Sequence, residues 1–307
     1  MRLAKRFNLV LGGALVGALL ILALAGLIYT PYSAVDVDLF SRFAAPSAQH
    51  WFGTDEFGRD VLSRILVGAQ VSLIDSASSV LFALTAGAAI GTVSGYVGGW
   101  IDRFVMMFVE ALMAFPGLLL ALGIMTVLGP SRWGVVLALG LAYTPSVTRL
   151  ARAGAASLRQ RDFVIASQAM GNGGTWTLFR HVLPNCIASL LVFSTTLFGS
   201  ALLAESALSF LGLGVPPPAP TWGGMLADSR NSMDHAIWLA IFPGTTISLA
   251  LLGVNLFGDA LRDLLDPRMK GVTVLACLNP LSESHVAGST PRPIFPPPAH
   301  PCSRCAI

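Results

Sequence analysis

Charged residues are scarce in this chain of 307 residues, and their scarcity excludes most soluble folds. Asp, Glu, Lys and Arg together make up 11% of the sequence, whereas a soluble globular protein carries roughly 25%. Hydrophobic residues make up 54%, and a single apolar core stops growing beyond about 250 to 300 residues. The composition therefore indicates a chain that is solvated largely by lipid.

Lysine is also rare, and this excludes two kinds of ligand. The lysines are Lys5 and Lys270, and neither follows a glycine as the lysine of a phosphate-binding loop does, so we expect no ATP site here. The formal net charge is only +3, without a dense basic stripe interleaved with aromatic residues. Nucleic acid is therefore a poor candidate partner.

Cysteine occurs four times, and three of the four lie beyond residue 270, which is not the pattern of a disulfide framework. Cys302 and Cys305 have the spacing of a metal or redox pair, but the second pair or βαβ context that would support such a site is lacking. No Ser-His-Asp or metal-ligand arrangement stands out in the apolar runs. We expect no catalytic, cofactor-binding or metal site in this chain.

Long apolar runs take the place of these features, and a run of about 20 residues crosses a bilayer. The run 133–148 is short and contains Pro145, but it extends through Arg149 if that side chain snorkels to the interface. The first run, residues 9–29, is too long for the apolar part of a secretory signal, which has about 7 to 15 residues. We therefore expect this run to be retained as a span. The sequence predicts an all-α polytopic membrane protein with about six transmembrane helices, at residues 9–29, 76–98, 111–128, 133–148, 186–204 and 236–258.

The distribution of basic residues predicts the orientation, because arginine and lysine accumulate in cytoplasmic loops. The segment between the fourth and fifth spans carries five arginines against one acidic residue, Asp162. With six spans, both termini lie on the same, cytoplasmic side. Segments 31–70 and 213–235 should then be external, and residues 60–73 have the helical spacing of an amphipathic helix at the membrane surface.

The predicted cytoplasmic segment 161–185 reads RDFVIASQAMGNGGTWTLFRHVLPN. Residues 163–170 are compatible with a helix, the glycines at 171, 173 and 174 break it, and a second helical piece, 176–183, should end at Pro184. A helix, a bend and a second helix would form a knob able to dock into a groove of a soluble partner. The residues alone leave open a plain basic loop between two spans.

This segment resembles the coupling-loop motif of bacterial ABC importer permeases. That motif runs Glu-Ala-Ala, three residues, Gly, nine residues, an apolar residue, one residue, then Leu-Pro. Ile165 stands in place of the leading Glu and Ser167 in place of the second Ala, so the resemblance implies the helix–bend–helix shape without the polar contact of that Glu. The matching positions are Ile165, Ala166, Ser167, Gly171, His181, Leu183 and Pro184.

Further stretches resemble the second membrane subunit of dipeptide, oligopeptide and nickel importers. They lie at 50–73, 94–102, 111–122, 204–226 and 255–268, in the family's order, and the resemblance covers residues 1 to about 270. It implies a type I ABC importer permease fold, with an N-terminal span, external loop and amphipathic helix over 1–75. A core permease domain follows over 76–270, with the coupling loop at 157–184. We expect the Pro- and Ser-rich residues 271–307 to be disordered.

The resemblance also implies partners and a location. It implies a second homologous permease, one or two ABC ATPase subunits that hold ATP and Mg²⁺, an extracytoplasmic substrate-binding protein, and the bacterial inner membrane. This chain would catalyse no covalent change. Short peptides are the commonest cargo of the branch, and nickel or another small solute stays open.

Two groups of polar residues are further candidates. Six residues of the external signature, Gly53, Thr54, Asp55, Gly58, Arg59 and Asp60, together with Glu56 could build a tight turn with paired charges, in a structural role or in contact with substrate.

Asp75, Glu110 and Glu205 are ionisable residues of the predicted spans, where a charge is expensive and therefore a candidate for function. Each lies near a span end, where water or a headgroup could reach it, and a packing role with a hydroxyl or backbone partner is the alternative. Glu205 is the first to test, because residues 208–215 and the prolines after them suggest a helix broken beside a cavity. Used as ion or proton relays, these acids would suit a gradient-driven secondary transporter. A scaffold that transports nothing is a third reading.

Overall fold

The computed structural model describes the backbone of residues 2–265 and the side chains of residues 9–263. Every regular element in this part of the chain is helical, so the predicted all-α fold is confirmed. The expectation for residues 271–307, with Cys302 and Cys305, falls outside the described residues.

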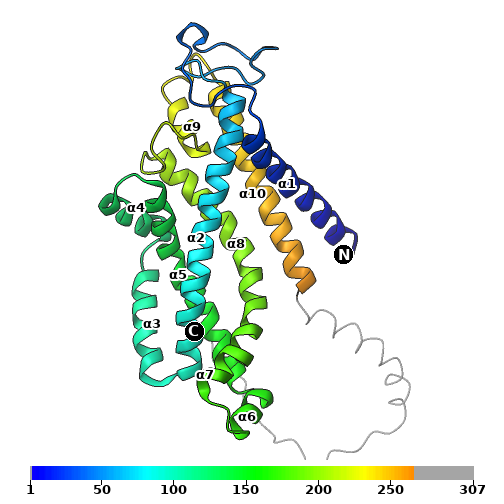
Figure 1. The fold of residues 1–307 in the computed structure, drawn as a ribbon, viewed down its shortest axis with the longest axis vertical. Helices are drawn as coiled ribbons and strands as arrows, with labels where there is room; N and C mark the ends of the chain where they lie inside the picture. Colours follow the sequence, from blue (N-terminus) through cyan, green and yellow to red (C-terminus); the bar gives the residue numbers. More distant parts are fainter. Residues whose placement is uncertain (1, 266–307) are drawn as a thin grey trace, which may run out of the picture. The chain divides into compact units, whose positions relative to one another are not determined.

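Five helices of the described part are long and apolar enough to cross a membrane. A sixth span results if two shorter helices, α3 (Gly99–Met113) and α4 (Gly117–Leu128), count as one. The predicted number of spans therefore holds only with this broken pair included. The five long helices are α1 (Arg2–Ile28), α2 (Val61–Val97), α5 (Arg132–Arg159), α8 (Leu183–Phe210) and α10 (Trp238–Leu265) (Figure 1).

The predicted third span, 111–128, is not one straight helix. α3 and α4 meet at an angle of 89°. Pro116 stands between them with extended backbone angles (φ −55°, ψ 130°), and a proline disfavours the helical conformation of the residue before it. Phe115 therefore leaves the helix, and α4 begins again at Gly117 in a new direction.

The prediction of a separate surface helix at 60–73 is also wrong, because these residues form the start of α2. This helix runs unbroken for 37 residues, a length of about 55 Å at 1.5 Å per residue. Val61 and Ile65 are almost completely buried and pack with Met225 and Leu239. Their apolar face is covered by protein, so no separate amphipathic helix forms.

The longest interface in the described part lies between α2 and α5. Gly87, Gly91 and Gly95, at four-residue spacing, line one face of α2 and let α5 approach closely, as their spacing predicts. A Cβ atom built on Gly87 would lie 2.6 Å from the Cβ of Val147. α5 passes through Pro145 without ending and is longer at both ends than the predicted span 133–148.

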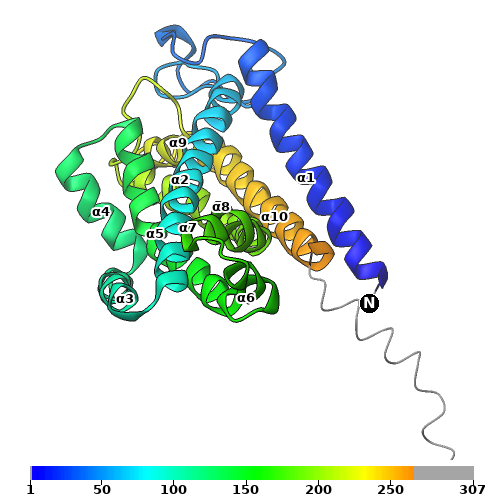
Figure 2. The same ribbon diagram turned by 60° about the horizontal axis from the view of Figure 1, so that its bottom comes forward.

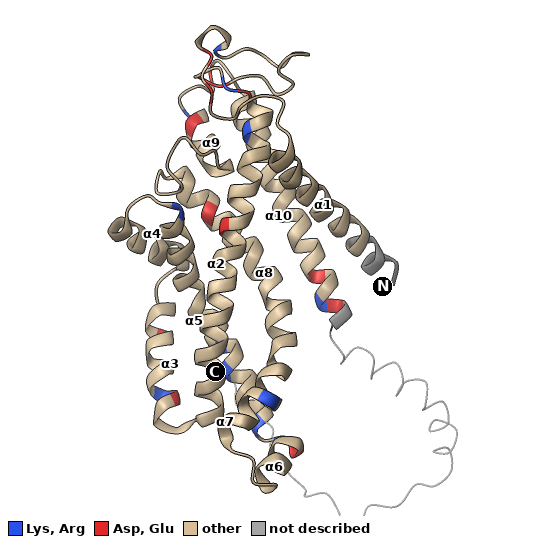
Figure 3. Ribbon diagram, viewed as in Figure 1, with Lys and Arg blue, Asp and Glu red and all other residues tan. Residues whose placement is uncertain are grey.

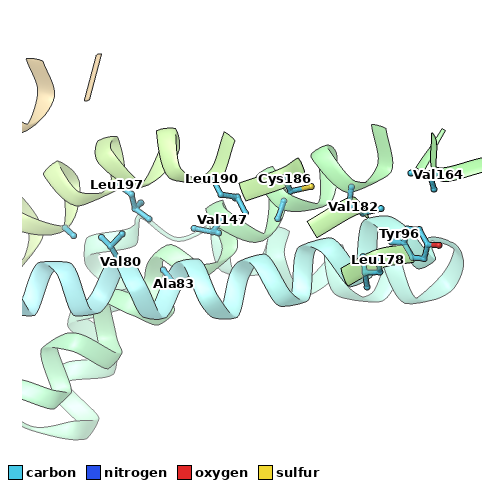
Figure 4. Packing of buried hydrophobic residues seen from close by; sticks show 13 residues of the cluster. Val80, Ala83, Tyr96, Val147, Val164, Leu178, Val182, Cys186, Leu190 and Leu197 are labelled. Atoms are coloured by element: carbon cyan, nitrogen blue, oxygen red, sulfur yellow. The ribbon is translucent and has the colours of Figure 1, made fainter. Parts of the chain in front are cut away.

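One buried cluster connects these spans to the short elements at one end of the bundle. It includes Val80 and Ala83 of α2, Val147 of α5 and Leu190 of α8 (Figure 4). It continues to Val164 in α6 (Asp162–Ala169), and it also reaches the π-helical turn η2 (Leu178–Val182) that follows α7 (Gly174–Thr177). The short helices are thus packed onto the bundle by apolar contacts.

The remaining short elements lie at the opposite end. The loop 29–60, with the 3₁₀ turn η1 (Leu39–Ser41), and α9 (Trp222–Ser229) lie together there, away from α6 and α7 (Figures 1 and 2). Acidic and basic residues gather mostly near these two ends, with few along the middle of the long helices (Figure 3). Apolar helices with charged ends match a chain that spans a membrane.

Candidate functional site

Residues 160–182 form a compact knob between α5 and α8, made of α6, α7 and η2. The bend after α6 depends on Gly171, whose φ is +85°. No atom lies within 4 Å of a Cβ built there, so the backbone angle and not crowding requires glycine. The predicted first helix and bend of the knob are therefore present.

The second half of the knob differs from the prediction, because its helix does not end at Pro184. The chain passes from α7 through η2 into α8 without a break, with Pro184 in the first turn of α8. A proline has no N–H for the carbonyl four residues earlier and crowds it. The wider π-helical turn, in which the Leu183 N–H bonds the Leu178 carbonyl, separates these groups and lets the helix continue.

The inner face of the knob is fixed to the bundle. Val164 and Val182 are fully buried in the cluster of Figure 4. Ser167 Oγ lies 3.1 Å from Thr177 Oγ1, which joins α6 to α7, and Gln168 donates a hydrogen bond of 3.1 Å to the Tyr96 hydroxyl at the end of α2. A force on the knob would therefore reach α2 and α8 directly.

The outer face of the knob exposes large apolar side chains. Met170 is 75% exposed and Phe179 65%. The His181 ring packs edge-on against Trp176, with the centroids 5.1 Å apart. Ala166 is exposed, whereas Leu183 and Pro184 begin α8. Five exposed large hydrophobic residues in so short a segment are typical of a docking surface: Phe163, Ile165, Met170, Trp176 and Phe179.

The external signature forms a tight turn whose groups bond one another. Asp55 accepts hydrogen bonds of 2.9 Å from the N–H groups of Phe57 and Arg59, and it pairs with Arg59 Nε at 2.7 Å. Gly53 and Gly58 both have a φ of +74°. These positive φ angles favour glycine at the two bends of the turn.

The same turn starts α2 and ties the loop to α10. Asp60 caps α2 by accepting from the N–H and hydroxyl of Ser63 at 2.8 and 2.7 Å, and it contacts His50 Nδ1 at 3.0 Å. Trp238 Nε1 donates to the Thr54 carbonyl at 3.2 Å. Gly53, Thr54, Asp55, Gly58, Arg59 and Asp60 are all buried. This geometry favours a structural role over contact with substrate.

Arg64 connects this turn to α9 and was not singled out by its sequence context. Its guanidinium lies 3.5 Å from both Asp55 and Asp228. Burial raises the pKa of the Asp228 carboxyl, and the positive charge of Arg64 opposes that shift. Arg64 thus adds an ionic contact between the two segments expected to be external, 31–70 and 213–235.

The structure brings two of the three candidate acids together. Asp75 of α2 is 1% exposed and pairs with Arg132 Nε of α5 at 2.6 Å. Glu205 of α8 is fully buried near Asp75 and is not open to a cavity, whereas α8 ends at Phe210, inside the stretch 208–215 where a helix break was expected. Glu110 is exposed on α3 and lies instead near Arg152.

A second ion pair, between α3 and α5, was also not predicted from the sequence. Arg152 of α5 binds Asp102 of α3 through two hydrogen bonds of 2.7 and 2.5 Å, and Ser94 of α2 donates to the same carboxylate at 2.7 Å. Arg152 was noted only as part of the basic loop. The pair fixes α3 to α5 near the knob.

These features define a polytopic α-helical membrane protein. The knob is packed onto one end of its helix bundle, and the hydrogen-bonded turn at residues 53–60 lies at the other end. Residues 87–271 match the family model described as binding-protein-dependent transport system inner membrane component. The chain belongs to this family and is the permease subunit of an ABC importer, a multi-pass protein of the inner membrane.

Comparisons with individual proteins agree with this assignment. The chain is 40% identical over 269 residues to the dipeptide transport system permease protein of Alkalihalophilus pseudofirmus, covering 88% of each chain. Among solved structures it is similar to the methionine ABC transporter MetNI in an inward-facing conformation, with a TM-score of 0.54 and 14% identity. That match covers 66% of this chain and 96% of the other, and it shows the type I importer permease fold.

Proposed function

We propose that this permease forms half of the translocation path of an ATP-driven importer of short peptides. The cargo is inferred from the similarity to a dipeptide permease over 88% of both chains. A second homologous permease would complete the path, and an extracytoplasmic binding protein would deliver the peptide at segments 31–70 and 213–235. Both termini would lie in the cytoplasm.

The proposal that transport is coupled to a separate ATPase rests on the structure of the knob. Its inner face packs into the cluster shared by α2, α5 and α8, and its outer face exposes apolar side chains such as Ile165 and Trp176. A soluble ATPase that bound this face would move the knob and the long helices together as a rigid body. ATP and Mg²⁺ would bind on the ATPase alone.

Ile165 occupies the position at which the family's coupling motif has Glu, and it is 53% exposed. Apolar contact would then replace a polar contact with the partner at this position. We propose that Ala166, Ser167, Gly171, His181, Leu183 and Pro184 keep the shape of the knob. The contact of Ser167 with Thr177, the φ of Gly171 and the ring contact of His181 with Trp176 support this role.

Uptake in a strain that lacks the chain tests the cargo. Restoring the chain should restore uptake of a labelled dipeptide, while nickel uptake should not change. Recovery of nickel uptake alone would assign the permease to the nickel importers of the same branch.

The energy source is tested in the same strain. Dipeptide uptake should stop when the partner ATPase is deleted, even with the ion gradients intact. Uptake that follows an ion gradient without any ATPase would instead support a secondary transporter using Asp75, Glu110 or Glu205.

A further inference from the structure

Ionisable side chains from three helices meet inside the bundle. Glu205 of α8 is fully buried, accepts a hydrogen bond of 2.9 Å from Ser209 Oγ, and is close enough to Asp75 of α2 for the two carboxyl groups to interact electrostatically. Arg132 of α5 reaches Asp75 Oδ1 at 2.6 Å and is itself 45% exposed. Two acids and one arginine therefore share one site.

Several oxygen atoms at this site have no hydrogen-bond partner. They are Asp75 Oδ2 and the hydroxyls of Ser72 and Ser76, all inaccessible to solvent. The three residues lie at i, i+3 and i+4 and therefore share one face of α2. Ser72 lies beside Glu205 but does not reach normal hydrogen-bond geometry. Asp75 Oδ2 is therefore a buried acceptor to which no group donates.

The net charge of the cluster is unfavourable when both acids are ionised. With both acids ionised, Asp75, Glu205 and Arg132 sum to one negative charge. An unpaired charge away from water costs several kcal/mol, and the groups of a buried site neutralise rather than bear that cost.

Within the described part of the chain, the other elements around Glu205 supply no positive charge that is not already paired with an acid. α4 carries no ionisable residue. The Tyr143 hydroxyl of α5 donates to the Ser200 carbonyl at 3.0 Å. On the α9 side, Asp228 pairs with Arg64.

The charges of α10 are remote from this site. They begin at Asp259, next to Gly258, which packs on Thr195, ten residues before Glu205 in α8. The neutralising charge must therefore enter the cluster itself.

We propose that the cluster of Glu205, Asp75 and Arg132 is a proton-binding site, in which Glu205 carries one proton and Asp75 stays ionised against Arg132. The protonated acid gives the site no net charge and supplies a donor toward the unpartnered oxygens of α2. The proton would leave only when water enters between α2 and α8. This inference does not rest on the proposed cargo or on the coupling to an ATPase.

Infrared spectroscopy of the full chain in lipid nanodiscs tests the site, because a protonated carboxylic acid has a carbonyl stretch that a carboxylate lacks. At pH 7 we expect one such band, its loss in Glu205→Gln, and its retention in Glu110→Gln, the matched exposed acid. A wild-type titration to alkaline pH, in which the band should disappear, gives the same readout without a variant.

The absence of a protonated-acid band in the wild-type chain at pH 7 would overturn the proposal. A band that persists in Glu205→Gln would overturn the assignment to this residue. Loss of the wild-type band on adding NaCl, with choline chloride as the control, would show that a metal cation occupies the site in place of the proton.

Discussion

The close contact between α2 and α5 makes Gly91→Ala a sharp test of the fold. A Cβ atom at Gly91 would lie 2.8 Å from the Cβ of Ala151 and 3.0 Å from the backbone nitrogen of Arg152, and closer still to the Thr148 carbonyl oxygen. Two of these three atoms belong to the α5 backbone and cannot rotate away. The helices would have to separate along their longest interface.

The expected magnitude follows from two opposing terms. Replacing glycine by alanine inside a helix stabilises it by about 1 kcal/mol. Forcing extra volume into a packed interface costs roughly 1–3 kcal/mol, and a clash with backbone belongs at the upper end. We therefore expect Gly91→Ala to lower the free energy of unfolding by about 2 kcal/mol.

Gly123→Ala is the matched control, because Gly123 lies inside α4 with no atom within 4 Å of a Cβ built there. It should gain about 1 kcal/mol from helix propensity alone. Thermal unfolding of both variants in one detergent at one scan rate compares them directly. If Gly91→Ala unfolds at the same temperature as Gly123→Ala or above it, the close packing of α2 on α5 is wrong.

Further predictions concern the knob and the ion pairs. Gly171→Pro introduces a residue whose φ is fixed near −65° at a position where φ is +85°. The variant should insert into the membrane but no longer pull down the ATPase. Gly173→Pro is the control, because φ at this position is already −65°, and it should keep the ATPase bound. Retained binding in Gly171→Pro would count against docking through the knob. Arg132→Ala leaves the buried Asp75 unpaired and should cost about 3 kcal/mol of stability in a thermal melt. Arg152→Ala leaves unpaired an acid, Asp102, whose side chain is 16% exposed, and should cost about 1 kcal/mol. Equal losses in the two variants would contradict this ranking.

Patterns local in the sequence predicted much of the fold. The apolar runs placed the five long helices, and the glycines at 87, 91 and 95 indicated close helix packing. The Gly171 bend of the knob followed from glycine's conformational freedom alone. Each of these features depends on residues within a few turns of one another.

The errors arose where packing overrode local pattern. The amphipathic stretch 60–73 looked like a surface helix because its apolar face had no visible partner, yet α9 and α10 cover it. Pro184 looked like a helix end, but a π-helical turn accommodates it. The pairing of Asp75 with Arg132 joins residues 57 positions apart. Only the packing of α5 on α2 brings them together.

Affinity purification of the tagged chain from membranes in mild detergent, followed by mass identification of the proteins that accompany it, tests whether the chain works as one subunit of an ATP-driven importer. We expect a second permease and an ATPase with a phosphate-binding loop in the same complex. A chain that is recovered alone, or as a homo-oligomer, in several gentle detergents would contradict it.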